Sequence, residues 1–182
     1  FENSGRHPGT TFAGGTLDPV TSVFTPVVVG DARVIHLTKD PSTGAYRIAH
    51  ISVDESMVQA MIAGMNDPIL ADARERELQS RTSVITEGVG LRDVGIDGKP
   101  WQITQNQRSL AVVTPGSLTP QGRVIGTPTR VDSITLVEDD ILLITSDGFT
   151  DAVTVPELES IVSEGGNVQE ITARMLARVT AN

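Results

Sequence analysis

The sequence predicts an α+β fold built on antiparallel sheets. The order of the segments carries this prediction, because strand-like runs, helical segments, further strands and two final helices follow one another along the chain. The links between neighbouring strands are short, which favours antiparallel pairing over parallel βαβ units. The length of 182 residues fits one domain or a large piece of one, and no internal repeat divides it.

Four strand-like runs occupy the N-terminal part of the chain. They are separated by turn residues such as Asp, Pro and Gly. Gly30-Asp31 indicates a hairpin turn between the second and third runs. Connections this short predict a meander, in which each run pairs with the next. The runs are TTFAGGTL (10–17), SVFTPVVVG (22–30), ARVIHLT (32–38) and AYRIAHISV (45–53).

A helical pattern begins after Val53. Apolar side chains recur at helical spacing between residues 54 and 65, and either Asp54 or Ser56 is placed to cap the start of this helix. The next stretch, 66–81, is highly charged and predicts an interrupted helix with a solvated face.

The C-terminal part predicts strands first and helices afterwards. An acidic turn at 138–140 joins two of the strands, Pro156 suits the first turn of a helix, and Asn167 is a cap for the last one. The strand segments are 109–118 and 130–148, and the helices are 155–165 and 168–179.

Composition narrows the function classes. The net charge of −9 and the isoelectric point of about 4.7 disfavour binding to nucleic acid, which depends on Lys and Arg. The absence of cysteine excludes disulfides, thiolate metal sites and cysteine nucleophiles. No apolar stretch approaches the roughly 18 to 20 residues of a membrane span, so we expect no membrane partner and a cytoplasmic protein.

Asp147 is the strongest candidate for chemistry. It follows the apolar run 141–144, and Gly148 after it would let the chain turn sharply with its backbone close to a ligand. A carboxylate at the mouth of a buried strand is costly unless a cation or hydrogen bonds satisfy it. Mg²⁺ and Mn²⁺ prefer oxygen ligands. Asp147 and Gly148 therefore predict a metal site.

Simpler roles are open for the same residues. Asp147 taken alone fits an Asx turn or a helix cap, and Asp151 fits a turn or cap residue better than a ligand. His36 and His50 lie in neighbouring predicted strands and could face each other. These two, and His7, are interpreted as surface or core histidines rather than as ligands.

A series of motifs in a fixed order resembles the metal-dependent protein phosphatases, the PPM or type 2C family. In that family one expects a GTT strand, a VGDSR turn, an LT-x-DHS helix start, an RN-x-IT-x-ALG stretch and GD-x-LLL-x-SDGLTD. The last motif is the most specific, and the resemblance covers most of residues 8–180, with a poor match from about 91 to 130. The matching segments are PGTTFAGGTL (8–17), VVVGDARVIHLT (27–38), ISVDESMVQAMI (51–62), SRTSVITEGVG (80–90) and DDILLITSDGFTDAVTVPELESIV (139–162).

The resemblance implies a sandwich of two antiparallel sheets flanked by helices. It implies a serine/threonine phosphatase that hydrolyses phosphomonoesters of phosphoproteins through metal-bound water, with two or three Mn²⁺ or Mg²⁺ ions. Asp147 matches a main metal ligand, and Asp54 matches the ligand of a third ion. Residues 64–80 match the variable flap. Residues 1–182 are then a single phosphatase-like domain, incomplete at its N-terminus.

Parts of the family pattern lie outside the sequence. The N-terminal Asp-Gly motif that bridges the main ions would precede residue 8, and the last ligand motif would follow the final helix. Glu55 stands where the family has the His of DHS. We therefore expect activity only when a missing half or partner chain is supplied. The alternative is a non-catalytic phosphatase-like module for interaction or regulation.

Overall fold

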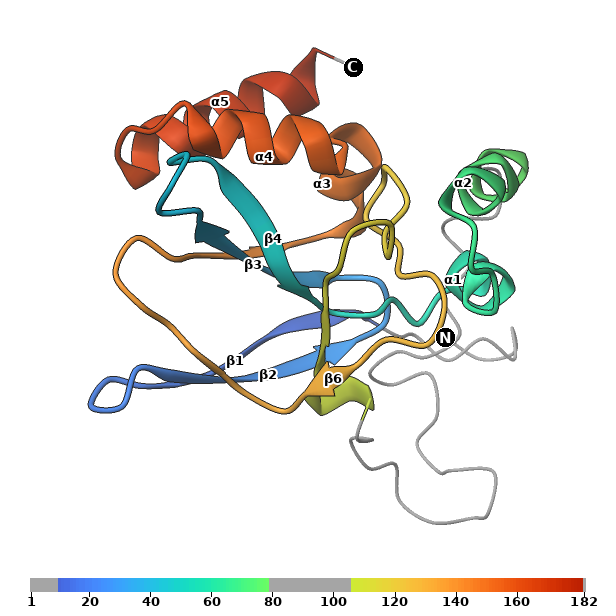
Figure 1. Cartoon of the computed structure of the whole chain (residues 1–182), viewed down its shortest axis with the longest axis horizontal. Helices are drawn as coiled ribbons and strands as arrows, with labels where there is room; N and C mark the ends of the chain where they lie inside the picture. Colours follow the sequence, from blue (N-terminus) through green and yellow to red (C-terminus); the bar gives the residue numbers. More distant parts are fainter. Residues whose placement is uncertain (1–9, 79–105, 182) are drawn as a thin grey trace, which may run out of the picture.

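The computed structural model describes residues 10–78 and 106–181, and it is an α+β arrangement with two antiparallel sheets and a set of helices (Figure 1). The predicted class is confirmed at this level. The helical layer α3, α4 and α5 lies over one sheet, and the other sheet lies on the far side of it (Figure 1).

The smaller sheet has three strands in the order β1-β2-β7. β1 (Phe12–Asp18) pairs along its whole length with β2 (Val23–Val29), and β2 continues to the short β7 (Ile134–Thr135). In β2, Phe24, Pro26 and Val28 are buried while Thr25 between them is exposed. This period of two is that of a strand with one face against the core.

The larger sheet has five strands in the order β6-β5-β4-β3-β8. The chain enters β3, an interior strand between β4 and β8, at a buried arginine, and residues 33–37 are all buried. A strand buried along this length needs neighbours on both sides, and β3 has β4 and β8. The strands are β3 (Arg33–Lys39), β4 (Tyr46–Ile51), β5 (Leu110–Val112), β6 (Arg130–Val131) and β8 (Ile141–Thr145).

The predicted meander is wrong between β2 and β3, which belong to different sheets. Gly30-Asp31 is therefore a crossing between sheets and not a hairpin turn. Gly30 has φ of 88°, and its carbonyl accepts the Glu55 N–H at 2.8 Å while its own N–H donates to Glu55 Oε2 at 3.0 Å. These two bonds tie the chain to the segment after β4, so it cannot fold back along β2. The acidic turn after β7 is likewise a change of sheet.

Two helices begin at capping residues that the sequence indicates. Ser56 accepts the Gln59 N–H at 3.2 Å and caps α1, and Asn167 accepts the Glu170 N–H at 3.0 Å and caps α5. Asp67 caps α2, whose first residue is Pro68. The helices are α1 (Met57–Ile62), α2 (Pro68–Glu77), α3 (Asp147–Ala152), α4 (Val155–Ser163) and α5 (Val168–Thr180), with a 3₁₀ turn at η2 (Asn106–Arg108).

The core has two main clusters, one on each face of the five-stranded sheet. The first fills the space between this sheet and α4 and α5, and includes Leu37, Leu158 and Met175. The second lies between the two sheets and includes Phe24 and Val34. Each fully buried side chain of this size contributes roughly 1.5–3 kcal/mol. The five-stranded sheet is thus packed on both faces, and this packing stabilises β3 and β8.

Replacing Glu157 with Gln is expected to lower the free energy of unfolding by about 1 kcal/mol at pH 7. Glu157 accepts the Thr154 N–H at 2.9 Å and pairs with Arg178 at 2.5 Å, and these bonds lower its pKa from 4.5 to about 2. Because the folded-state pKa is depressed, this contribution is complete above pH 4.5 and is lost as the pH falls towards 2.

Urea unfolding between pH 2 and pH 7 measures this effect. Glu164→Gln is the matched control. The Glu164 carboxylate also pairs with an arginine, Arg174, at 3.3 Å, but it is 57% exposed, so its replacement should change the free energy of unfolding little at either pH. A wild-type advantage over Glu157→Gln that is the same at pH 2.5 and pH 7 would contradict the account.

Candidate functional site

The ends of β3 and β8 bring two carboxylates together. Arg33 at the start of β3 pairs with Thr145 at the end of β8 in an antiparallel register. Asp31 comes two residues before Arg33, and Asp147 comes two residues after Thr145. Both acids therefore lie at the same end of the paired strands β3 and β8. Asp31 is only 5% exposed, and Asp147 is partly exposed.

The pKa of Asp31 is raised by its surroundings in this site. Burial raises the pKa of its carboxyl group, and the neighbouring charge of Asp147 raises that pKa further. Asp54 adds a smaller effect in the same direction, and Arg123 opposes it. A buried carboxylate that faces a second carboxylate is a place where a cation is favoured. Asp31 is not predicted as a site residue from the sequence, because a Gly-Asp pair between strands is a common turn signal.

Asp147 is the first residue of α3, and one residue, Ser146, separates it from β8. Its Oδ1 accepts the N–H of the next residue, Gly148, at 2.8 Å, whereas an Asx turn would use the N–H two residues on. The electrostatic coupling to Asp31 and Asp151 shows that other acids lie nearby. The carboxylate thus combines a local hydrogen bond with a place in an acidic site.

The interpretation of Gly148 as a residue needed for a sharp turn is wrong. Gly148 lies inside α3, and a Cβ added to it would meet only Ser146 Oγ, at 3.8 Å. The chain passes from strand to helix without a left-handed conformation at this position. Its metal-site role, through the backbone, stays a prediction.

Asp54 is held by two arginines. Its side chain is 2% exposed, and its oxygens accept Nε of Arg33 at 2.8 Å and Nη2 at 2.7 Å. Arg123 Nη1 also donates to Asp54 Oδ2. Both oxygens are therefore engaged by guanidinium groups, and Asp54 in this arrangement does not fit the third-ion ligand that the resemblance implies.

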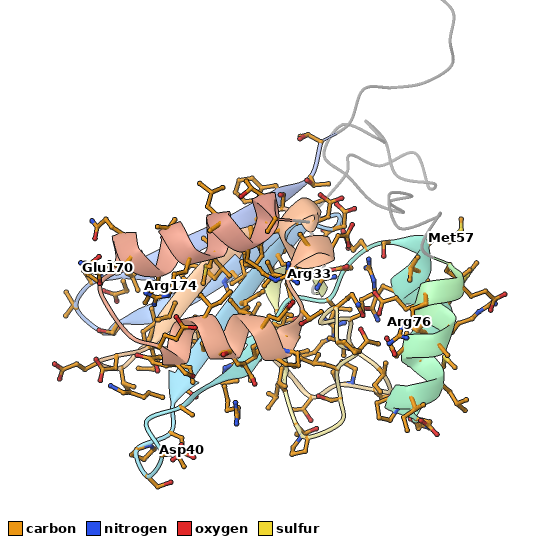
Figure 2. All side chains as sticks on the ribbon, turned by 90° about the horizontal axis from the view of Figure 1, so that it is seen from above. Arg33, Asp40, Met57, Arg76, Glu170 and Arg174 are labelled. Atoms are coloured by element: carbon orange, nitrogen blue, oxygen red, sulfur yellow. The ribbon has the colours of Figure 1, made fainter. Side chains whose placement is uncertain are left out.

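The two arginines belong to a buried polar network. Arg123 donates from Nε to Glu75 at 2.6 Å and from Nη1 to Ser56 at 3.1 Å, and Arg33 donates to the carbonyl of Gln121 at 2.6 Å. Figure 2 shows Arg33 in the middle of the molecule. The network joins β3, α2 and the loop before β6. An arginine at the head of a buried strand was the available signal in the sequence.

Asp151 connects the network with the acidic site. Its Oδ1 lies 3.9 Å from Nη2 of Arg123, and its side chain is 44% exposed. Burial raises its pKa, Arg123 and Arg33 oppose this, and Asp147 adds to it. Asp151 follows Asp147 by one helical turn, so the two acids lie on one face of α3. Asp151 therefore interacts with Arg123 and Asp147, in addition to the turn or cap role that its sequence context indicates.

Asp31 and Asp147 are the right kind of ligand for a hard divalent ion, but two carboxylates are too few to hold it. Carboxylate oxygens are the ligands that Mg²⁺ and Mn²⁺ prefer. Within residues 10–78 and 106–181, however, no group of three or more His, Asp or Glu side chains is placed to hold a metal ion. Asp31 and Asp147 would form part of a site that needs further ligands.

His36 and His50 face each other as predicted. They are directly paired between β3 and β4, their rings stack with centroids 5.2 Å apart, and their Nδ1 atoms lie 3.0 Å apart. Asp140 Oδ2 is 3.0 Å from Nε2 of the buried His36, a contact without hydrogen-bond alignment. Burial, and then His36, lower the pKa of His50. The pair is a core feature within the described part of the chain.

His7, the segment 80–90, the part 91–105 of the poorly matching stretch (about 91–130) and the end of the expected flap lie outside the described residues. No helix among the described residues is both long enough and apolar enough to cross a bilayer. Comparisons with protein-family models, with curated proteins and with solved structures find no match for this chain.

Proposed function

We propose that the chain forms part of a Mn²⁺- or Mg²⁺-dependent phosphatase that hydrolyses phosphomonoesters, with phosphoserine or phosphothreonine proteins as the substrate class. The observation that carries this proposal is the juxtaposition of Asp31 and Asp147 at the ends of β3 and β8. The motif resemblance supplies the reaction class.

The charge balance of the site supports a cation. Within the described residues around it, Asp31, Asp147 and Asp151 add three negative charges to a network in which Arg33 and Arg123 are already paired with Asp54 and Glu75. Arg123 compensates part of this charge through its contact with Asp151, and a divalent ion would stabilise the excess of negative charge. Bound there, such an ion would act as a Lewis acid towards phosphoryl oxygens.

The residues of this chain hold the site in place. Arg33 is the first residue of β3 and Asp31 lies two positions before it in the turn, so the anchoring of Arg33 by Asp54 fixes the chain close to Asp31. Asp147 is fixed by its position at the junction of β8 and α3. Both carboxylates therefore approach the site from rigid elements, as positioning for catalysis requires.

Activity with p-nitrophenyl phosphate tests the proposal. With excess Mn²⁺, the full-length protein is expected to hydrolyse this ester, and Asp147→Asn is expected to lower kcat/KM by more than about 100-fold, because losing a ligand should exceed the 10- to 100-fold effect of its supporting residues. Glu138→Gln, an exposed acid on the turn before β8, is the control and should leave the rate unchanged. An Asp147→Asn rate equal to that of the wild type would refute the assignment.

A second candidate is a non-catalytic interaction or regulatory module. The occupation of Asp54 by two guanidinium groups favours it, because that residue is withdrawn from metal binding. This candidate expects no hydrolysis by the full-length protein at any Mn²⁺ concentration.

A further inference from the structure

The outer edge of β8, the side that faces away from β3, is open. β8 is the last strand of the five-stranded sheet, and among the described residues no strand pairs with it on that side. Its five residues are four aliphatic side chains and one threonine, without a charge. None of the five is buried, although the residues opposite them, 33–37 of β3, all are. An open edge of this composition is a template for pairing with another strand.

The register of the sheet shows which backbone groups face outwards. Val34 accepts the Ser52 N–H at 2.9 Å, so its backbone groups point to the β4 side of β3. Those of the next residue, Ile35, point to β8, because the direction alternates along an antiparallel strand. The residue opposite Ile35 lies between Leu142 and Ile144, so these two turn their N–H and C=O groups away from β3. Within the described part of the chain, these outward groups face no strand.

Acidic residues flank both ends of this edge. Glu138 and Asp139 are exposed on the turn before β8, and Asp147 comes two residues after its last residue. Lys39 offsets the charge of Asp139, at 3.0 Å, but Glu138 has no ion pair with a described residue. An edge that is apolar in its middle and acidic at both ends complements a strand with an apolar centre and basic ends.

A second copy of the chain is a poor match for the outer edge of β8. The antiparallel register that bonds Leu142 of one copy to Ile144 of the other places Asp139 opposite Asp147. Like charges directly opposite each other destabilise a pair of strands. The net charge of −9 also opposes self-association. The charges therefore favour a different, basic segment over a second copy.

We propose that the outer edge of β8 binds an extended segment of a partner protein as an added strand, with apolar residues at the centre of the segment and Lys or Arg at both ends. Backbone bonds to Leu142 and Ile144 supply the affinity, and the acidic flanks select the charge. The side chain of Ile144, which is 47% exposed, offers an apolar contact to the centre of the segment. The proposal does not rest on the phosphatase assignment, because it uses the backbone of β8 and the charges beside it.

Three fluorescein-labelled peptides, titrated with the protein in EDTA and followed by fluorescence anisotropy, test the proposal. They are KKTVTVTVKK, its acidic counterpart EETVTVTVEE, and a copy of the first in which the central Thr-Val pair is N-methylated. The first should bind saturably, and the other two at least about tenfold more weakly, because one is repelled and the other loses backbone donors. Amide chemical shifts should change most at Leu142 and Ile144. Equal affinity for all three peptides, or no saturable binding, would overturn the proposal.

A proline variant assigns the binding to the backbone of β8. Ile144→Pro removes one outward N–H and should weaken the basic peptide about tenfold, and proline is tolerated on an edge strand where the N–H faces solvent. Ile144→Val keeps that N–H and should bind as the wild type does. Urea unfolding checks that both variants are folded. A folded Ile144→Pro protein with the affinity of the wild type would refute strand addition.

A charge reversal tests the acidic flank without touching the strand. Glu138→Lys should weaken the basic peptide about threefold and strengthen the acidic one by a similar factor. Glu77→Lys is the matched control, because it makes the same change at an exposed acid of α2, on the other side of the molecule (Figure 1). It should leave both affinities close to those of the wild type. Equal responses to the two reversals would refute the charge match at this edge.

Discussion

Replacing Arg123 with Met is expected to lower the free energy of unfolding by about 3 to 5 kcal/mol. Arg123 is 2% exposed and donates to Asp54 and to Glu75, which is itself 5% exposed. Without the guanidinium group, Glu75 would lose the cation that pairs with it, and among the described residues no group donates to its Oε2. The cost comes from this uncompensated charge rather than from the lost attraction.

The double variant Arg123→Met with Glu75→Leu distinguishes these two causes. It removes the buried charge together with its partner, so most of the lost stability should return. Arg76→Met is the control, because Arg76 is 69% exposed and its pair with Asp72 is worth less than about 1 kcal/mol. Urea unfolding followed by circular dichroism gives all four values. A double variant as unstable as Arg123→Met alone would contradict the account.

Replacing Asp31 with Asn is expected to have opposite effects with and without a divalent ion. In a chelator the variant should be more stable than the wild type by about 1 kcal/mol, because it removes a buried charge next to Asp147. With Mn²⁺ at about 100 times its dissociation constant, the wild type should gain about 2.7 kcal/mol and the variant almost nothing. With Mn²⁺ the wild type is then more stable than the variant, which reverses their order of stability in the chelator.

Thermal unfolding in EDTA and in Mn²⁺ measures this reversal. Glu138→Gln removes one negative charge from an exposed turn and should respond to Mn²⁺ as the wild type does. If Asp31→Asn is destabilised in EDTA and still gains stability from Mn²⁺, Asp31 is a structural residue and has no part in binding the ion.

Local features of the fold could be predicted from the sequence because their causes are local. Ser56, Pro156 and Asn167 mark helix starts through bonds within a few residues, and the strand runs follow from alternation. The assignment of strands to sheets could not be predicted in this way. β2 and β3 are separated by three residues, yet the bonds between Gly30 and Glu55 direct β3 into the other sheet.

The same distinction applies to the site. Asp147 was identifiable because an acid at the end of an apolar strand is unusual whatever surrounds it. Asp31 was not, since its signal as a turn residue is common and its importance depends on the pairing of β3 with β8. The role of Asp54 depends on Arg123, which is 69 residues away in sequence, and no local pattern indicates that contact.

Mn²⁺ titration followed by electron paramagnetic resonance of the ion tests the central claim most directly, that Asp31 and Asp147 hold one divalent ion between β3 and β8. The wild type is expected to bind Mn²⁺ saturably, with Asp31→Asn and Asp147→Asn each at least tenfold weaker and Glu138→Gln unchanged. Equal Mn²⁺ affinity in all four proteins would contradict the claim.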